Sequence, residues 1–370
     1  MSLSFRKTLI CTVGTSLLQN LRQKNAELIN GSQNSRYQVM NLLLKQSADA
    51  RFCGAEINSI ESIVKKKLLA GNQCLYLLVS DTEEGHLTGD LLERYFRHLS
   101  CPIRFETVAI QVIEGLTGSS VHRFRTEGLR NLVKVIASII RKHGNAQTLI
   151  NATGGYKAQI SFAGMIGQAF DIPVCYLFES FPEVIELPAQ PISPDLTFWL
   201  ANVNVFYDLA VDAALPEQIG QDPRFETLAD TVVVDGQSLV GFSAVGQLFH
   251  ENFCHRFQLY KKNMLPPESG IESAAKMIKY EDNNHGKHAG LSFFLDKLVV
   301  STYVTRIYTH YYHPSLPSVI RFRRSSTGKT DQIEGTFSNG QATTRFDLVT
   351  TAQTPAQRDA ILADMNERFQ

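Results

Sequence analysis

The chain has 370 residues, more than one ordinary domain needs, and this length favours two or three domains. Hydrophobic residues make up 44% and charged residues 19%, which is typical of a globular protein and excludes a disordered chain. The 36 basic side chains balance the 36 acidic ones, so a polybasic nucleic-acid coat is not expected.

Cysteine spacing and the lengths of the apolar runs narrow the class of protein further. The six cysteines include no C-x-x-C pair, which argues against a zinc ribbon or a thioredoxin-type site. The apolar run at residues 8–13 is too short for the core of a signal peptide, and no run approaches the roughly 20 residues that cross a bilayer. We therefore expect a cytoplasmic protein with no membrane partner.

The first 190 residues alternate between strand and helix patterns. Short apolar runs predict strands at residues 8–13, 74–80, 103–113, 147–151 and 173–178. Apolar residues at helical spacing predict helices at residues 38–47, 57–70, 87–99, 128–142 and 156–170. This alternation predicts an α/β fold, a doubly wound Rossmann-like parallel sheet. Ligands of such sheets bind beyond the carboxyl ends of the strands, which here means after residues 13, 80 and 150.

A proline-rich boundary and a change of pattern divide the rest of the chain. We expect a connector over residues 191–256, with a hairpin of strands 231–234 and 238–242 and then a helix that Ser243 caps. The connector is either winged-helix-like or a dimerising hairpin. Residues 257–370 are expected to form an α+β domain with a helix over 289–310, although residues 299–305 favour a strand. A strand at 319–324, a hairpin of 333–337 with 343–349, and a terminal helix from Thr354 complete it.

Two loops after predicted strands carry groups that suit a phosphate. The first contains Gly14, Thr15 and Ser16, where free backbone N–H groups and hydroxyls would precede a helix; a plain helix cap is the alternative reading. The second loop also lies between a predicted strand and a predicted helix. Its Lys157 falls in the first turn of that helix, where a cation opposes the helix dipole unless an anion is bound. Its residues of interest are Asn151, Thr153, Gly154, Gly155 and Lys157. Neither the P-loop nor the G-x-G-x-x-G spacing is present.

The two motifs together resemble those of the CRISPR-associated Rossmann fold (CARF) proteins. Cys-Thr-Val-Gly-Thr-Ser-Leu-Leu at residues 11–18 and Asn-Ala-Thr-Gly-Gly-Tyr-Lys-Ala at residues 151–158 are similar to motifs of the branch that contains the stand-alone ring nucleases of type III CRISPR systems. The resemblance covers roughly residues 6–180. It implies a homodimer whose two-fold axis passes through a pocket for cyclic oligoadenylate, usually cyclic tetra-adenylate. It also implies that Ser16 and Lys157 act at the scissile phosphates.

The expected chemistry needs neither a metal nor another cofactor. RNA supplies its own nucleophile, the 2′-hydroxyl, so a pocket that holds this oxygen in line with the phosphorus provides much of the catalysis. Lys157 would stabilise the developing charge, and Ser16 with nearby N–H groups would orient the phosphate. The products would be linear oligoadenylates with a 2′,3′-cyclic phosphate. No general base is apparent among these residues, which predicts slow turnover.

The resemblance also implies a second possible function for the C-terminal part, because members of the wider family often carry an effector domain, commonly a ribonuclease, that the bound ring activates. A RelE-like messenger RNA interferase fits the element order, with an RNA site that the histidines and basic residues would supply and with RNA or the ribosome as partner. The residues in question are His285, Lys287, His288, Arg321 and Arg323. The plain alternative is a solvated strand face with surface histidines. A HEPN ribonuclease would need Arg306 and His313 on one helix, which Pro314 disfavours.

Three functions therefore remain open from the sequence. The first is a ring nuclease that also gates the C-terminal domain. The second is a ring-activated ribonuclease whose catalysis lies wholly in that domain. The third is a non-catalytic regulator that binds DNA through the connector, which the absence of a basic helix there disfavours.

Overall fold

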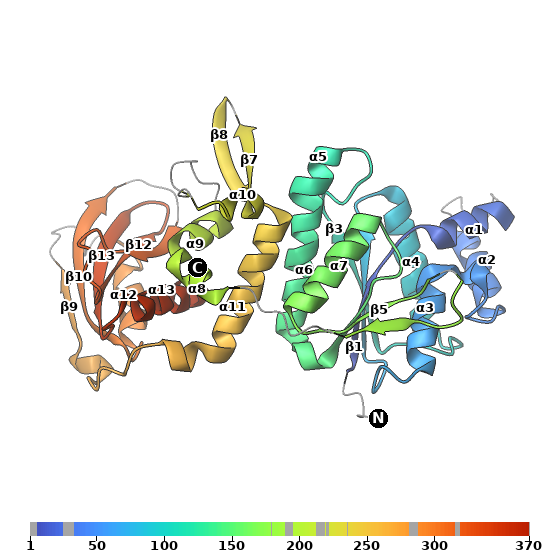
Figure 1. The fold of residues 1–370 in the computed structure, drawn as a ribbon, viewed down its shortest axis with the longest axis horizontal. Helices are drawn as coiled ribbons and strands as arrows, with labels where there is room; N and C mark the ends of the chain where they lie inside the picture. The colour runs from blue at the N-terminus through green and yellow to red at the C-terminus, as the bar shows by residue number, and fades with distance from the viewer. Residues whose placement is uncertain are drawn as a thin grey trace. The chain divides into compact units, whose positions relative to one another are not determined.

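A computed structural model describes residues 6–24, 33–178, 180–188, 195–211, 219, 222–234, 236–280, 288–314 and 319–369. The chain forms two compact units (Figure 1). The first unit comprises Met1–Pro194, Asp222–Asp230 and Phe242–Asn252, and the second comprises Asp195–Gln221, Thr231–Gly241 and Phe253–Gln370.

The first unit is built on a six-stranded sheet of order β3-β2-β1-β4-β5-β6. The first five strands are parallel to their neighbours, and β6 is antiparallel to β5. The strands are β1 (Thr8–Thr12), β2 (Cys74–Ser80), β3 (Thr107–Ile113), β4 (Thr148–Asn151), β5 (Val174–Tyr176) and β6 (Ile185–Leu187). The predicted doubly wound α/β fold is confirmed, and the chain reverses strand order between β1 and β4.

Helices cover both faces of this sheet. Successive side chains of β1 point to opposite sides, so a strand buried along its whole length needs a packing partner on each face. Leu9 and Cys11 belong to one buried cluster, whereas Ile10 belongs to another, which contains residues of α6 and α7. The helices are α1 (Ser16–Lys24), α2 (Gln33–Leu44), α3 (Gly54–Lys65), α4 (Glu83–Arg97), α5 (Val121–Arg123), α6 (Leu129–His143) and α7 (Lys157–Ala169). Short helical turns at Arg51–Cys53, Phe124–Gly128 and Asn145–Gln147 also belong to the described part of this unit.

Strands β3 and β5 are shorter than the sequence predicts; β5 covers only Val174–Tyr176 within the expected residues 173–178. We expected a strand over residues 103–113, but β3 begins only at Thr107. Phe105 lies in the irregular segment before β3, where its N–H donates to the Phe96 carbonyl oxygen and its ring packs edge-on against the Phe96 ring. Burial of Phe105 against α4 therefore competes with extension of the strand.

The second unit contains a five-stranded sheet of order β11-β12-β13-β10-β9. Its strands are β9 (Met277–Tyr280), β10 (Val304–His313), β11 (Val319–Arg324), β12 (Gln332–Ser338) and β13 (Thr343–Thr350). The β9–β10 pair is parallel and the other pairs are antiparallel. The helices of this unit are α8 (Leu196–Ala201), α9 (Val203–Val211), α12 (Leu291–Val299) and α13 (Pro355–Phe369), with a single turn at Ser273–Ala275. The predicted α+β layout of the C-terminal part is confirmed.

The predicted helix over residues 289–310 is wrong in its second half. Helix α12 ends at Val299, and β10 begins at Val304. The intervening run contains β-branched and aromatic residues, and these lose side-chain freedom in a helix but pack well on a sheet. Strand pairing with β13 and β9 therefore wins over helical continuation.

The remaining elements are α10 (Phe225–Leu228), the hairpin of β7 (Ala229–Val234) and β8 (Gln237–Phe242), and α11 (Ala244–Met264). Ser243 caps α11, since its hydroxyl oxygen accepts from the Gly246 N–H at 3.0 Å. Trp199 on α8 is fully buried in the second unit and stacks on Phe253 with ring centroids 5.6 Å apart. Within the described residues, no helix is long and apolar enough to cross a membrane.

Candidate functional site

The loops after β1 and β4 touch at the point where the strand order reverses. The Thr12 hydroxyl donates to the Gly154 carbonyl oxygen at 2.6 Å, which ties the two loops together. A β-carbon built on Gly14 would lie 2.7 Å from the Gly155 nitrogen, and one on Gly154 would lie 2.9 Å from the Gly14 nitrogen. The glycines thus permit two backbones to approach more closely than any side chain would allow. The two sequence motifs are therefore in direct contact.

A buried glutamate that the sequence analysis did not single out lies beneath both loops. Glu56, on α3, is fully buried, and its Oε1 accepts from the Gly14 N–H at 2.7 Å. Burial raises the pKa of Glu56, and the hydrogen bonds from Gly14 and Ser16 oppose this shift. The Gly14 N–H is therefore engaged with Glu56. The only sequence signal for Glu56 was an acidic residue on the apolar face of a helix.

Ser16 is the first residue of α1 and its hydroxyl is held on two sides. Its Oγ accepts from the Ala55 N–H at 3.0 Å and lies 3.5 Å from Glu56 Oε2. The second distance is long for a hydrogen bond between oxygens, so the hydroxyl proton is only weakly committed to Glu56. Ser16 is half-buried and lines a groove, which leaves it within reach of a ligand.

Asn151 and Thr153 support the second loop from within the protein. The Asn151 side chain is fully buried; its Nδ2 donates to Ser59 Oγ at 2.8 Å, and its Oδ1 accepts from the Thr153 hydroxyl at 2.6 Å. Thr153 Oγ1 in turn accepts from the Leu177 N–H. Asn151 therefore holds the loop in place rather than presenting its own amide to the surface, whereas Thr153 lines the groove with Ser16.

The second loop ends in the turn that starts α7. Gly155 has φ 103°, and a β-carbon there would overlap Gln159 Oε1, so only glycine fits without strain. Lys157 is the first residue of α7 and its side chain is exposed. In the first loop, Thr15 is half-buried beside the start of α1. The groups that remain accessible at the loops thus include the hydroxyls of Ser16 and Thr153 and the Lys157 ammonium group.

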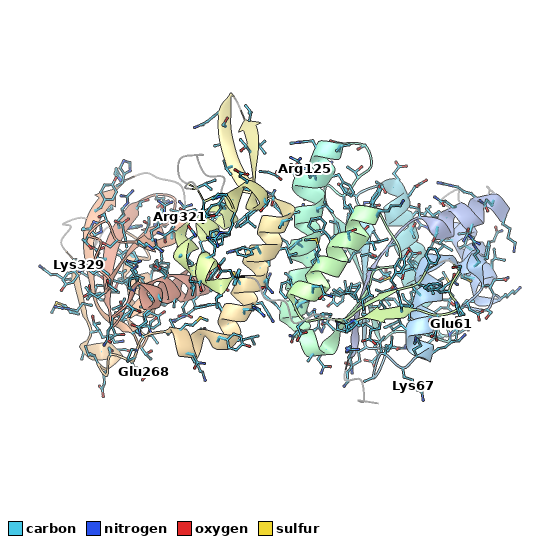
Figure 2. All side chains as sticks on the ribbon, in the orientation of Figure 1. Glu61, Lys67, Arg125, Glu268, Arg321 and Lys329 are labelled. Atoms are coloured by element: carbon cyan, nitrogen blue, oxygen red, sulfur yellow. The ribbon has the colours of Figure 1, made fainter. Side chains whose placement is uncertain are left out.

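A groove of about 840 Å³ adjoins the loops and is lined by Ser16 and Thr153 at the site. Phe178 and Phe181 also line it; they are nearly half exposed and meet edge-on with ring centroids 5.3 Å apart. Three bases and three acids line the groove as well, namely Arg51, Lys65, Lys66, Asp49, Glu61 and Glu183; Glu61 is labelled in Figure 2. The groove therefore combines aromatic faces with balanced charge.

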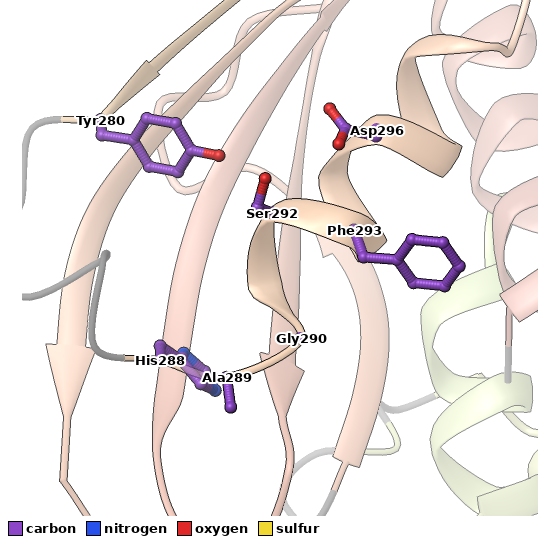
Figure 3. A pocket seen from close by; sticks show the side chains of 7 residues that line it. All are labelled: Tyr280, His288, Ala289, Gly290, Ser292, Phe293 and Asp296. Atoms are coloured by element: carbon purple, nitrogen blue, oxygen red, sulfur yellow. The ribbon is translucent and has the colours of Figure 1, made fainter.

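Of the C-terminal candidates that the structure describes, His288 has partners that differ from those of Arg321 and Arg323. His285 and Lys287 lie outside the described residues. His288 is buried, with its Nδ1 2.8 Å from the Thr344 hydroxyl and its ring against Phe337, and burial lowers its pKa. It borders a pocket that Tyr280, Ser292 and Asp296 also line (Figure 3). The plain alternative, in which the histidines are surface residues, is therefore wrong for His288.

Arg321 and Arg323 both face Asp208, a residue of α9. Arg323 makes two hydrogen bonds to this carboxylate, at 2.9 and 3.4 Å, and Arg321 Nε lies 3.4 Å from it; Figure 2 labels Arg321. Arg323 is 41% exposed and Arg321 is 23% exposed, so neither is a freely solvated side chain. Arg306 and His313 lie on strand β10, and the single helix that the HEPN reading requires is not formed there.

No group of three or more His, Cys, Asp or Glu side chains within the described ranges is arranged to hold a metal ion. The six cysteines are free thiols. Burial, aided by the Glu56 charge, raises the pKa of the Cys11 thiol beneath the first loop. Cys11 is thus a packing residue of the site.

The chain is similar to one protein family and to a solved structure. Residues 51–190, less than half of the chain, match the family model of a CRISPR-associated protein (Cas_APE2256). A structure of Can2 from Sulfobacillus thermosulfidooxidans in complex with cyclic tetra-adenylate is similar at 11% identity, covering 72% of this chain and 69% of that chain, with a TM-score of 0.25. This TM-score is too low to establish a shared fold. No curated protein matches the chain.

Proposed function

We propose that the first unit binds cyclic oligoadenylate at the joined loops and cleaves it, as a ring nuclease of a type III CRISPR system with a CARF domain. The observation that carries the proposal is the contact between the loops after β1 and β4, because it joins the loop that precedes Ser16 to the loop that leads into α7. The match of residues 51–190 to a CRISPR-associated family supports it. Residues 1–190 would bind the ring, 191–256 would connect, and 257–370 would form an effector-like domain.

The chemistry follows from the accessible groups. The ring's 2′-hydroxyl loses its proton to water as its oxygen bonds to the adjacent phosphorus. The bond from phosphorus to the 5′-oxygen breaks and the 5′-oxygen takes a proton from water, so a linear product with a 2′,3′-cyclic phosphate and a 5′-hydroxyl results. Lys157 stabilises the charge that develops on the phosphate oxygens, and Ser16 donates a hydrogen bond that orients the phosphate. Glu56 positions Ser16 and the Gly14 loop from below rather than touching the ring. Positioning dominates, and turnover is slow.

The groove beside the loops is suited to a nucleobase. Aromatic faces of Phe178 and Phe181 stack on bases, and this contact is tolerant of orientation. The ring is expected to lie across two protomers of a homodimer, as in the CARF proteins that the motifs resemble. Cyclic tetra-adenylate is the ring that we expect.

The test is incubation of the full-length protein with labelled cyclic tri-, tetra- and hexa-adenylate in EDTA, with products resolved by mass. We expect the wild type to convert one of the rings, and we expect Ser16→Ala and Lys157→Ala each to abolish this conversion. Ser100→Ala and Lys45→Ala, at exposed residues, are the controls and should retain it. Conversion that survives in both site variants would refute the catalytic assignment. Binding without conversion would make the first unit a ring sensor, and absence of both would refute ring binding.

A ribonuclease in the second unit is the second candidate function. A polar, partly exposed face of the second sheet favours it, and this face is independent of the ring site.

A further inference from the structure

The second sheet has one buried face and one face that is polar and partly exposed. Thr309, Phe346, Gly335 and Phe322 pair side by side across β10, β13, β12 and β11, and all of them are buried. Residues that pair side by side point to the same face of a sheet, and neighbours along each strand point to the other. The opposite face carries two rows: Tyr308, Asp347, Glu334 and Arg323, and then Tyr311, Arg345, Thr336 and Arg321.

A bulge in β10 places a histidine between the carboxylates of the first row. The register with β13 shifts between Thr309 and Tyr311, so His310 is the inserted residue. Its Nε2 lies 3.8 Å from Glu334 Oε2 and 3.8 Å from Asp347 Oδ2. Asp347 is itself fixed by the Ser325 hydroxyl, which donates to its Oδ1 at 3.1 Å. Bulges of this kind re-aim a side chain and are frequent beside active sites.

The second row supplies a stacking surface and cations next to this histidine. Tyr311 is 38% exposed, and its ring stacks with that of His313 at an interplanar angle of 16°. Arg345 lies opposite Tyr311 on the neighbouring strand β13, and its guanidinium is 5.1 Å from the centre of the Tyr311 ring. Aromatic and guanidinium planes are the surfaces on which proteins stack unpaired RNA bases, and arginine also binds phosphate.

We propose that this face is a ribonuclease site for single-stranded RNA, with His310 as its general base. The site offers a proton acceptor, two anions beside it, a base-stacking surface and cations, but among the residues of the two rows there is no cysteine or serine nucleophile. A substrate that brings its own nucleophile fits this inventory, and RNA brings the 2′-hydroxyl. The site is distinct from the ring site and does not depend on it.

The step balances with water as the only co-reactant. His310 Nε2 takes the proton of the 2′-hydroxyl while this oxygen bonds to the adjacent phosphorus, and the bond from phosphorus to the 5′-oxygen breaks. The 5′-oxygen takes a proton from water, and His310 then returns its proton to the hydroxide so formed. Glu334 and Asp347 stabilise the transient imidazolium, and Arg345 stabilises the phosphate. The products are a 2′,3′-cyclic phosphate and a 5′-hydroxyl.

The test uses the full-length protein and a labelled single-stranded RNA, with and without cyclic tetra-adenylate. We expect cleavage in at least one condition, no cleavage of a fully 2′-deoxy substrate, and a loss of about 100-fold or more in rate for His310→Ala. Arg345→Ala should raise KM. His122→Ala, at an exposed histidine of the first unit, and Lys297→Ala, on α12, should cleave like the wild type.

Three results would overturn the proposal. One is intact RNA in both conditions with a protein that is folded by circular dichroism. Another is cleavage that His310→Ala leaves unchanged. The third is RNA cleavage, measured without the ring, that is abolished by Ser16→Ala or Lys157→Ala but retained by His310→Ala. The first unit would then be the ribonuclease. Ring cleavage by a protein that leaves RNA intact would overturn this inference alone.

Discussion

Replacement of Gly154 by alanine should destabilise the first unit and separate the two loops. The new β-carbon would overlap Glu56 Oε1, and Glu56 is buried and cannot move into solvent. Displacing this carboxylate breaks its 2.7 Å hydrogen bond from the Gly14 N–H. Overpacking costs about 1–3 kcal/mol, and a lost buried hydrogen bond to a charged group adds about 1.5–3 kcal/mol in the limit of complete rupture. Partial relaxation of both gives about 2–4 kcal/mol.

Urea denaturation followed by far-ultraviolet circular dichroism measures this loss. With a slope of about 2–3 kcal/mol/M, the midpoint of the first unit should fall by about 1 M. Gly164→Ala is the matched control, because it lies within α7 and its β-carbon would meet no atom within 4 Å. It should be neutral or stabilising by up to about 1 kcal/mol. Equal midpoints for Gly154→Ala and the wild type would refute the interlocked geometry.

Further predictions concern buried groups in both units. Glu56→Gln should flatten the pH dependence of the free energy of unfolding. Burial raises the pKa of Glu56 in the folded state, so the wild type loses stability as the pH rises from the ordinary pKa of about 4.5 through the folded-state pKa. Urea denaturation at several pH values measures this, and the same pH dependence in the variant and the wild type would contradict it. Asp364→Ala should cost about 3–5 kcal/mol in the second unit, because Tyr303 and Lys261 lose a buried partner; an unchanged melting temperature would count against it. Gly335→Ala should cost about 1–3 kcal/mol, since the new methyl group would overlap the Phe346 ring, and calorimetry would reveal the loss.

The fold of the first unit could be predicted because its central strands, β1, β2 and β4, are buried on both faces. Such strands read as unbroken apolar runs, as in Cys74–Ser80, and the helices between them are amphipathic. The helix–strand boundary near Val299 could not be predicted in this way, because a short apolar stretch fits either period. Pairing with distant strands decided it, and local sequence does not contain that information.

The candidate site was predictable only as far as its loops. Glycines and hydroxyls after apolar strands indicated where Ser16 and Lys157 would lie, and the strand order placed these loops side by side. Glu56 was missed because it comes from a helix 40 residues beyond Ser16, and only the fold brings it beneath the loop. His310 was missed for the same reason: its two carboxylate neighbours lie on different strands, and a bulge decides which way it points.

The single tryptophan of the chain has a spectroscopic consequence. Trp199 is fully buried in the second unit, where it stacks on Phe253 and meets Tyr207 edge-on. Its emission therefore reports the environment of that unit alone, and no tryptophan in the first unit obscures it. A change in this emission on addition of cyclic oligoadenylate would be a label-free signal that occupancy of the first unit is felt in the second, and stopped-flow fluorescence would give the rate at which that signal arrives.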